Sequence, residues 1–262
     1  MKTLFKLALP ILLIILLLGC ESNRGEELVL KANNEWVKGR NHSAIEIFKS
    51  VLKKHPSGLF AEEALFRLGE IYHFSLNNSA QAISYFQEVM ELNKTGSFSF
   101  DAQRYIAEIM EFTFKDYDQA IIEYQNLINK FNEPQKNVDH QYRIASIYFK
   151  KQNYDQALAE FEVLLEKYPK SAQVEETQFK ILEILYTLGR CSDVQGHYNN
   201  FLDTYPGSKY RSEMKFIAAS CLEEKGMLKE AYDQFQSLKT NYTYPVLLEM
   251  KIESIEKRIK KK

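Results

Sequence analysis

The stretch that decides the fold reads VDHQYRIASIYFKKQNYDQALAEFEVLLEKYPKS and runs from Val138 to Ser171. Its second half carries a small, an aromatic and an aliphatic residue at Ala157, Phe161 and Leu164. The spacing i, i+4, i+7 places these side chains on one face of a helix. Pro169 ends that helix, because proline disfavours helical backbone in the residue before it. The first half carries a small residue of its own, Ala145, so the stretch predicts two closely packed helices.

The same pattern recurs along most of the chain at intervals of 37 or 38 residues. The small position of the second helix holds Ala44, Ala82, Ala120, Ala157, Val194 and Ala231. The aromatic position four residues later holds Phe48, Phe86, Tyr124, Phe161, Tyr198 and Phe235. The small position of the first helix holds Ala32, Gly69, Ala107, Ala145, Leu182 and Ala219. The second and third units contain one extra residue, within residues 74–81 and 112–119. The pattern predicts about six helical hairpins.

These positions resemble the tetratricopeptide repeat, whose signature is a small residue in the first helix, followed by small, aromatic and apolar residues and a proline in the second. The usual period of that repeat is about 34 residues. The longer units of this chain are similar to the repeats of BamD- and CpoB-type envelope lipoproteins. The resemblance implies an all-α fold, a right-handed tetratricopeptide-repeat superhelix over residues 26–244, with a concave groove that binds a protein segment.

The last segment, residues 245–262, is expected to cap the array. Pro245 opens a helix whose apolar stripe consists of Leu248, Ile252, Ile255 and Ile259. A stacked array exposes its final apolar face unless a helix with a polar back covers it. The basic residues at the end of this helix either complement its dipole or contact lipid phosphates; they are Lys257, Arg258, Lys260, Lys261 and Lys262.

The N-terminus carries a targeting pattern. Lys2 and Lys6 precede an apolar run that ends in Leu17-Leu18-Gly19-Cys20, and this run is short for a membrane span. The pattern resembles the lipobox of bacterial lipoproteins, which implies removal of residues 1–19, acylation of Cys20 and a short tether at residues 20–25. An uncleaved membrane helix and an ordinary secretory signal are the alternatives. Glu21, where an aspartate would favour the inner membrane, favours an outer-membrane lipoprotein facing the periplasm.

Composition excludes several classes of function. The net charge is −1, and without Lys2 and Lys6 it becomes −3, which argues against nucleic acid as a partner. The five histidines lack the spacing of metal ligands, and no nucleophile motif or glycine-rich phosphate loop is present. We therefore expect no enzymatic activity, no cofactor, no metal and no small-molecule substrate. Cys191 and Cys221 are compatible with one disulfide or with two buried thiols.

The repeat register indicates which side chains line the expected groove. One ring of equivalent positions is mainly aromatic and consists of Val29, Phe66, Arg104, Tyr142, Phe179 and Phe216. Phe149 and Tyr186 occupy another position in neighbouring units, and we expect them to be the anchors for a partner. We expect Glu108, Glu111 and Glu183 to flank them and to select basic segments. The alternative is that the aromatic rings simply pack between helices.

Three functions fit these features. The first is a lipid-anchored scaffold for protein interactions in the cell envelope, with outer-membrane protein assembly as the expected process. The second is a pilotin or chaperone lipoprotein for a secretin. The third is a Tol-associated coordinator of cell-wall synthesis. All three predict an envelope protein as the partner in the groove and the membrane as the partner of the lipid anchor.

The lipobox leads to a test of localisation. Cys20→Ser should leave an unprocessed or soluble periplasmic form, because the thiol that accepts the lipid is lost. Metabolic labelling with palmitate, combined with membrane fractionation, measures this. A Cys20→Ser protein that still matures to the same mass and fractionates with the outer membrane would contradict the lipid anchor.

Overall fold

The computed structural model describes residues 24–131 and 134–261, and every regular element in these two ranges is helical. The all-α prediction is therefore confirmed for the described residues. The expected signal peptide and Cys20 lie outside them. Arg24 and Gly25, which were expected to belong to the tether, are helical instead. The chain forms two compact units that divide between residues 132 and 133, and each is described by itself.

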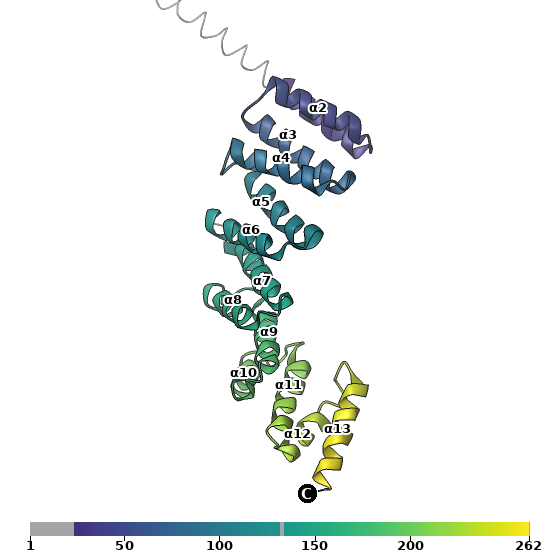
Figure 1. Cartoon of the computed structure of the whole chain (residues 1–262), viewed down its shortest axis with the longest axis vertical. Helices are drawn as coiled ribbons and strands as arrows, with labels where there is room; N and C mark the ends of the chain where they lie inside the picture. The colour runs from purple at the N-terminus through teal and green to yellow at the C-terminus, as the bar shows by residue number, and fades with distance from the viewer. Residues whose placement is uncertain (1–23, 132–133, 262) are drawn as a thin grey trace, which may run out of the picture. The chain divides into compact units, whose positions relative to one another are not determined.

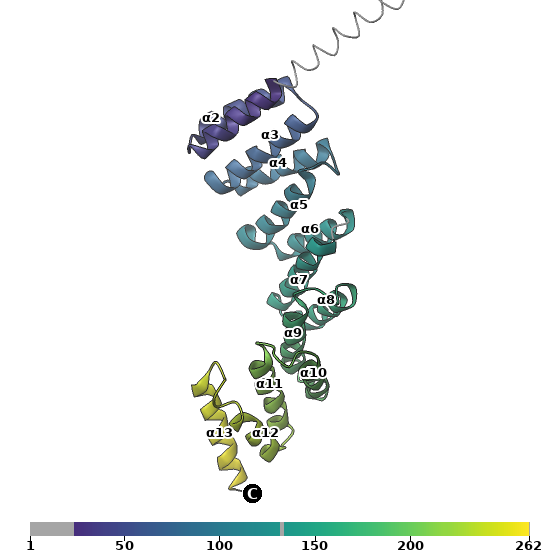
Figure 2. The ribbon, with the colours of Figure 1, turned by 180° about the vertical axis from the view of Figure 1, so that it is seen from behind.

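The N-terminal unit contains three helical hairpins (Figures 1 and 2). Its first helix covers residues 24–37. The others are α2 (Asn41–Lys54), α3 (Leu59–Glu70) with η1 (Ile71–Ser75), α4 (Ser79–Leu92), α5 (Ser99–Glu108) with η2 (Ile109–Phe114), and α6 (Tyr117–Lys130). Each helix packs mainly against the helices before and after it in the chain, as expected for a stack of hairpins.

The C-terminal unit contains three further hairpins and a last helix (Figure 1). Its helices are α7 (Pro134–Lys150), α8 (Tyr154–Lys167), α9 (Val174–Thr187), α10 (Cys191–Thr204), α11 (Arg211–Glu224), α12 (Leu228–Gln236) and α13 (Pro245–Ile259). None of the helices in the described part of the chain is long and apolar enough to cross a membrane.

The predicted small and aromatic positions form the cores of both units. The small residues of the second helices are all 0% exposed, and five of the six aromatic residues are at most 1% exposed, with Tyr198 at 5%. The approach is close at Gly69, where a Cβ atom would lie only 2.5 Å from the ring of Phe86. Asparagine or aspartate side chains cap α4, α6 and α8 by accepting a backbone N–H three residues later, which satisfies one of the unpaired donors at a helix start.

The extra residue in the second and third units is accommodated within a helix. Ile71–Ser75 and Ile109–Phe114 adopt π-helical geometry at the ends of α3 and α5. A π-turn holds one residue more than an α-turn. The second and third hairpins therefore keep the packing of Phe86 and Tyr124 although their sequences are longer by one residue.

The last helix caps the array largely as predicted. Leu248, Ile252 and Ile255 are buried in one cluster with Leu228, Ala231 and Phe235 of α12. Ile259 is 38% exposed, so the buried stripe ends one turn earlier than expected.

The basic end of the cap helix is engaged in ion pairs. Lys257 and Lys260 lie 3.8 and 3.7 Å from the carboxylates four residues earlier in the same helix. The guanidinium of Arg258 lies 2.7 Å from Glu223, which is also bound by Lys251. Intramolecular carboxylates thus partner several of the cations that could have contacted lipid phosphates.

The close approach at Gly69 gives a test of the packing. Gly69→Ala should destabilise the N-terminal unit by about 1–2 kcal/mol, because overpacking against a buried ring costs about 1–3 kcal/mol and exceeds the helix propensity gained. Gly196→Ala is the matched control, since nothing lies within 4 Å of its Cβ position, and it should stabilise by about 0.5–1 kcal/mol. Urea unfolding followed by circular dichroism measures both. Equal stabilisation by the two variants would show that the helix pair is loosely packed.

Candidate functional site

The five predicted partner-binding residues are divided between the two units. Glu108 and Glu111 lie in the N-terminal unit, at the end of α5 and in η2. Phe149, Glu183 and Tyr186 lie in α7 and α9 of the C-terminal unit. Each set is therefore considered within its own unit.

Glu111 is a core residue, and the prediction that it lies on a binding surface is wrong. It is 2% exposed, and its carboxylate accepts a hydrogen bond from the hydroxyl of Tyr124 at 3.0 Å. Tyr124 occupies the aromatic position that is phenylalanine in most of the other units. Its buried hydroxyl needs an acceptor, because an unpaired buried polar group costs about 1–3 kcal/mol. Glu111 thus satisfies a tyrosine of the core.

Glu108 is accessible, but its charge is already compensated. Arg104 donates to its carboxylate at 2.8 Å and also contacts Asp101 at 3.2 Å. The neighbouring carboxylates hold the pKa of Arg104 above its ordinary value despite the opposing effect of burial. A basic partner would have to displace Arg104, so Glu108 is poorly placed to select one.

Phe149 and Tyr186 are half-buried. The sequence had suggested that they project beyond the packing between helices, and the structure differs. Both rings pack against the core cluster formed by α7 to α11. Phe149 lies edge-on to Tyr154 with 5.5 Å between ring centres. Burial, followed by a hydrogen bond to Glu224, raises the pKa of Tyr186. The two rings therefore contribute to the fold, in agreement with the alternative that aromatic residues pack between helices.

The C-terminal unit contains an open groove of about 490 Å³, here called the C-terminal groove. Its lining comes from α9, α11, the turn before α11 and the loop before α13, and consists of Phe179, Glu183, Lys209, Tyr210, Glu213, Phe216, Ile217, Tyr242, Thr243 and Tyr244. Of the five predicted residues, only Glu183 lines this groove in the part of the chain that the structure describes. Lys180 lies 2.7 Å from its carboxylate.

Stacked aromatic rings form two walls of the C-terminal groove. Phe179 and Tyr210 stack with 5.1 Å between ring centres and an angle of 16°. Phe216 and Tyr242 stack at 4.6 Å and 7°. Tyr244 leans edge-on against Tyr242 at 5.9 Å and is 60% exposed. Stacking holds the rings in place before any ligand binds, so their faces and edges are available at low entropic cost.

Glu213 provides the uncompensated negative charge of the C-terminal groove. Its carboxylate accepts a hydrogen bond from the hydroxyl of Thr243 at 2.7 Å, and no cation lies within 4.0 Å of it among the described residues. Burial and the charge of Glu213 raise the pKa of Tyr242 to about 12. Tyr242 is neutral at physiological pH, as an unperturbed tyrosine also is. The groove combines aromatic surface with the Glu213 carboxylate and with Lys209, whose ammonium lies 4.9 Å from the centre of the Tyr210 ring.

Sequence reasoning identified part of this lining and missed the rest. Phe179 and Phe216 belong to the mainly aromatic ring of the repeat register, and the groove confirms that these two rings line a concave surface. Tyr210, Tyr242 and Tyr244 were missed because they lie outside the repeating positions. Tyr210 follows the Tyr205-Pro206-Gly207-Ser208 junction, and the other two precede Pro245. Their nearness to proline-marked ends of helices is the signal that could have indicated them.

The chemistry of the C-terminal groove favours binding over catalysis. Aromatic faces and a carboxylate suit an extended segment with apolar and basic side chains. No group of three or more histidine, cysteine, aspartate or glutamate side chains in the described residues could hold a metal ion.

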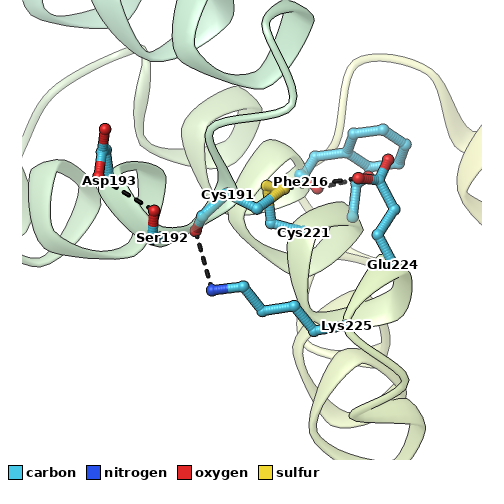
Figure 3. The surroundings of a disulfide bond; sticks show 8 residues. Cys191, Ser192, Asp193, Phe216, Cys221, Glu224 and Lys225 are labelled. Atoms are coloured by element: carbon cyan, nitrogen blue, oxygen red, sulfur yellow. Dashed lines mark hydrogen bonds between the residues drawn. A yellow bond between two sulfur atoms is a disulfide. The ribbon is translucent and has the colours of Figure 1, made fainter.

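A disulfide joins α10 to α11, the helix that also contributes to the lining of the C-terminal groove (Figure 3). Cys191, at the start of α10, is bonded to Cys221 in α11, with 5.3 Å between their Cα atoms. Lys225 donates to the carbonyl of Cys191 at 3.1 Å, next to the bond. The sequence had left a disulfide and two thiols as alternatives, and the structure contains the disulfide. The bond constrains α11, the helix that carries Glu213 and Phe216.

Comparisons with known proteins agree with the repeat architecture. Residues 134–242 match the family YfiO, described as outer membrane lipoprotein, and residues 29–96 match a tetratricopeptide-repeat family. No curated protein sequence matches the chain. The two family matches support a tetratricopeptide-repeat protein of the envelope-lipoprotein kind.

Solved structures with the same fold share little sequence with this chain. Naa15/Naa10 bound to HypK-THB has a TM-score of 0.61 and 16% identity over 88% of this chain and 34% of that chain. YrrB, described as a TPR protein with an unusual peptide-binding site, has a TM-score of 0.54 and 14% identity, and the match covers 79% of this chain and 97% of that chain. A tetratricopeptide-repeat protein from Parabacteroides merdae has a TM-score of 0.51 and 19% identity, and the match covers 88% of this chain and 86% of that chain. These similarities confirm the predicted tetratricopeptide-repeat fold.

The disulfide gives a test of stability. Replacing both Cys191 and Cys221 with alanine should lower the free energy of unfolding of the C-terminal unit by about 3–4 kcal/mol, the loop-closure effect of a crosslink over this separation. Urea unfolding with and without a reductant measures it. The reductant should destabilise the wild-type protein and leave the double variant unchanged. A wild-type protein that is insensitive to reductant and has both thiols free would refute the bond.

Proposed function

We propose that this protein is a lipid-anchored scaffold of the bacterial outer membrane that holds a segment of an envelope protein in its C-terminal groove. It acts by binding, without catalysis. The process that we assign to it is outer-membrane protein assembly.

The observation that carries the proposal is the C-terminal groove itself. Two preformed aromatic stacks, Phe179–Tyr210 and Phe216–Tyr242, flank one carboxylate that lacks a cation partner. Half-exposed aromatic side chains are the usual anchors of protein interfaces, because they add large apolar area with few rotatable bonds. A groove that is both open and preorganised is suited to an extended segment, whereas small molecules favour enclosed pockets.

The charges of the groove indicate the chemistry of the partner segment. Glu213 has no cation within 4.0 Å among the described residues, whereas Glu183 is already paired with Lys180. We infer that a lysine or arginine of the partner approaches Glu213 while apolar or aromatic side chains pack on Tyr210 and Tyr244. Binding should weaken as salt rises, since the ion pair is partly exposed.

The compartment is supported by two independent features. A disulfide persists in an oxidising environment such as the periplasm and is rare in the cytosol, and Cys191 and Cys221 are both buried and bonded to each other. The lipobox at Cys20 supports an anchor in the same compartment. The match of residues 134–242 to an outer membrane lipoprotein family supports the outer membrane as its location.

The groove can be tested with two substitutions that spare the core. Tyr244→Ala combined with Glu213→Gln should weaken partner binding at least about 30-fold, the effect of losing one interface anchor worth about 2 kcal/mol. Melting should hardly change, because Tyr244 is 60% exposed and the glutamine oxygen still accepts from Thr243. The control is Met250→Ala with Glu249→Gln on α13, where Met250 is 64% exposed. The control variant should bind normally.

The partner can be identified by crosslinking in intact cells. A photoreactive residue at position 244, with position 250 as the control site, should give an adduct that depends on Glu213. Mass spectrometry of an adduct with a barrel protein or its assembly factors supports the proposal. Adducts only with a secretin or only with cell-wall synthases would assign the protein to piloting or to cell-wall coordination instead, and equal adducts at both positions would contradict the groove.

A further inference from the structure

A second hollow lies at the opposite end of the repeat sequence, within the N-terminal unit. It has a volume of about 490 Å³ and is lined by Arg24, Glu27, Leu28, Lys31, Lys54 and His55. The first helix of the unit and the end of α2 supply these residues. It is here called the basic pocket, since cations outnumber its one carboxylate.

The packing beneath the basic pocket fixes the two helices that form it. Gly25 is buried against the ring of Phe60, where a Cβ atom would lie only 2.6 Å from the nearest carbon. His55 contacts the same ring edge-on, with 5.7 Å between ring centres. The side chains of the pocket therefore extend from a backbone that is held in place by one shared aromatic residue.

The cations of the basic pocket differ from Lys49 of α2 and from Lys38, which directly follows the first helix. Lys38 and Lys49 each lie 3.6 Å from a carboxylate three residues away. Arg24, Lys31 and Lys54 have no carboxylate within 4.0 Å in the part of the chain that the structure describes. Like charges that converge without partners repel one another, so they do not stabilise the fold as the paired lysines do. A polyanionic ligand would supply the missing countercharge.

We propose that the basic pocket binds the phosphate groups of anionic membrane lipids. The position of Arg24 favours this occupant, because it is four residues after Cys20. Four residues span at most about 14 Å. The inference rests on the lipid anchor of the proposed function, and it does not depend on the C-terminal groove. An anchored Cys20 keeps the pocket close enough to touch the headgroups, and a cation at the membrane surface strengthens binding about fivefold.

The consequence is that the first hairpin lies against the membrane surface. A lipid anchor on Cys20 fixes one point of the protein and leaves its orientation open. A second contact through Arg24, Lys31 and Lys54 restricts that orientation for the N-terminal unit. The acylated Cys20 supplies the attachment, and the pocket adds a contact that sets the orientation of the N-terminal unit.

The test measures binding to vesicles without the contribution of the anchor. The chain from residue 20 onward with Cys20→Ser retains every helix that the structure describes after the signal region. Its partition into phosphatidylglycerol vesicles at low ionic strength is compared with its partition into phosphatidylcholine vesicles. We expect measurable binding to the anionic vesicles only, and loss of that binding as salt rises.

Matched variants separate the basic pocket from net charge. Lys31→Glu with Lys54→Glu should reduce binding at least about tenfold, since two favourable cations become repulsive. Lys170→Glu with Lys229→Glu makes the same change in charge at exposed lysines of the C-terminal unit and should reduce binding less than about twofold. Glu27→Gln should increase binding. Equal losses in the two double variants would overturn the proposal, as would unchanged binding in both.

A second measurement distinguishes lipid phosphate from free phosphate. Inorganic phosphate is titrated calorimetrically into the same protein, and we expect no saturable binding. The lipid assignment would be overturned by two results together. Phosphate would bind saturably to the wild-type protein but not to Lys31→Glu with Lys54→Glu, and this variant would bind vesicles as the wild-type protein does. The basic pocket would then be assigned to free phosphate. Palmitate labelling of Cys20 and crosslinking at position 244 are independent of these readouts, so failure of the anchor or groove is recognised separately.

Discussion

The structure depends on the close approach of paired helices at their small residues. Alanine at most of these positions is completely buried, and at Gly69 even a Cβ atom would collide with the ring of Phe86. Because the two backbones are so near, one aromatic side chain per hairpin fills the remaining space, and little freedom remains in the angle between the helices. Close packing of this kind transmits any change in volume directly to the neighbouring side chains.

Repetition of that contact also explains why the C-terminal groove exists. Phe179 and Phe216 occupy the same position in consecutive units, 37 residues apart, so α9 and α11 present them to the same side. The groove is therefore a product of the repeat register for these two rings. Tyr210, Tyr242 and Tyr244 come from the segments between helices, where the register does not operate, and they make this groove different from one that any such array would have.

The hairpins and their core positions could be predicted from the sequence because the spacing i, i+4, i+7 is a local property of a helix. The exposure of Phe149 and Tyr186 could not be predicted, because it depends on which side chains, such as Tyr154 and Glu224, meet them in three dimensions. Glu111 could not be recognised as a core residue without knowing that it meets the hydroxyl of Tyr124. The availability of an acidic residue likewise depends on its neighbours: Glu108 is paired with Arg104, whereas Glu213 accepts a hydrogen bond from the hydroxyl of Thr243 and has no cation within 4.0 Å among the described residues.

The disulfide has a mechanical consequence. Cys191 and Cys221 are 30 residues apart in sequence, and the covalent ring that they close contains Lys209, Tyr210, Glu213, Phe216 and Ile217 of the C-terminal groove. A pulling force applied to one of these residues is divided between the two chain segments that connect it to the disulfide. A segment of this length without the crosslink would extend by roughly 100 Å when unfolded. The disulfide prevents that extension when α10 and the start of α11 unfold. The lining of the C-terminal groove is thus protected from being unfolded by force.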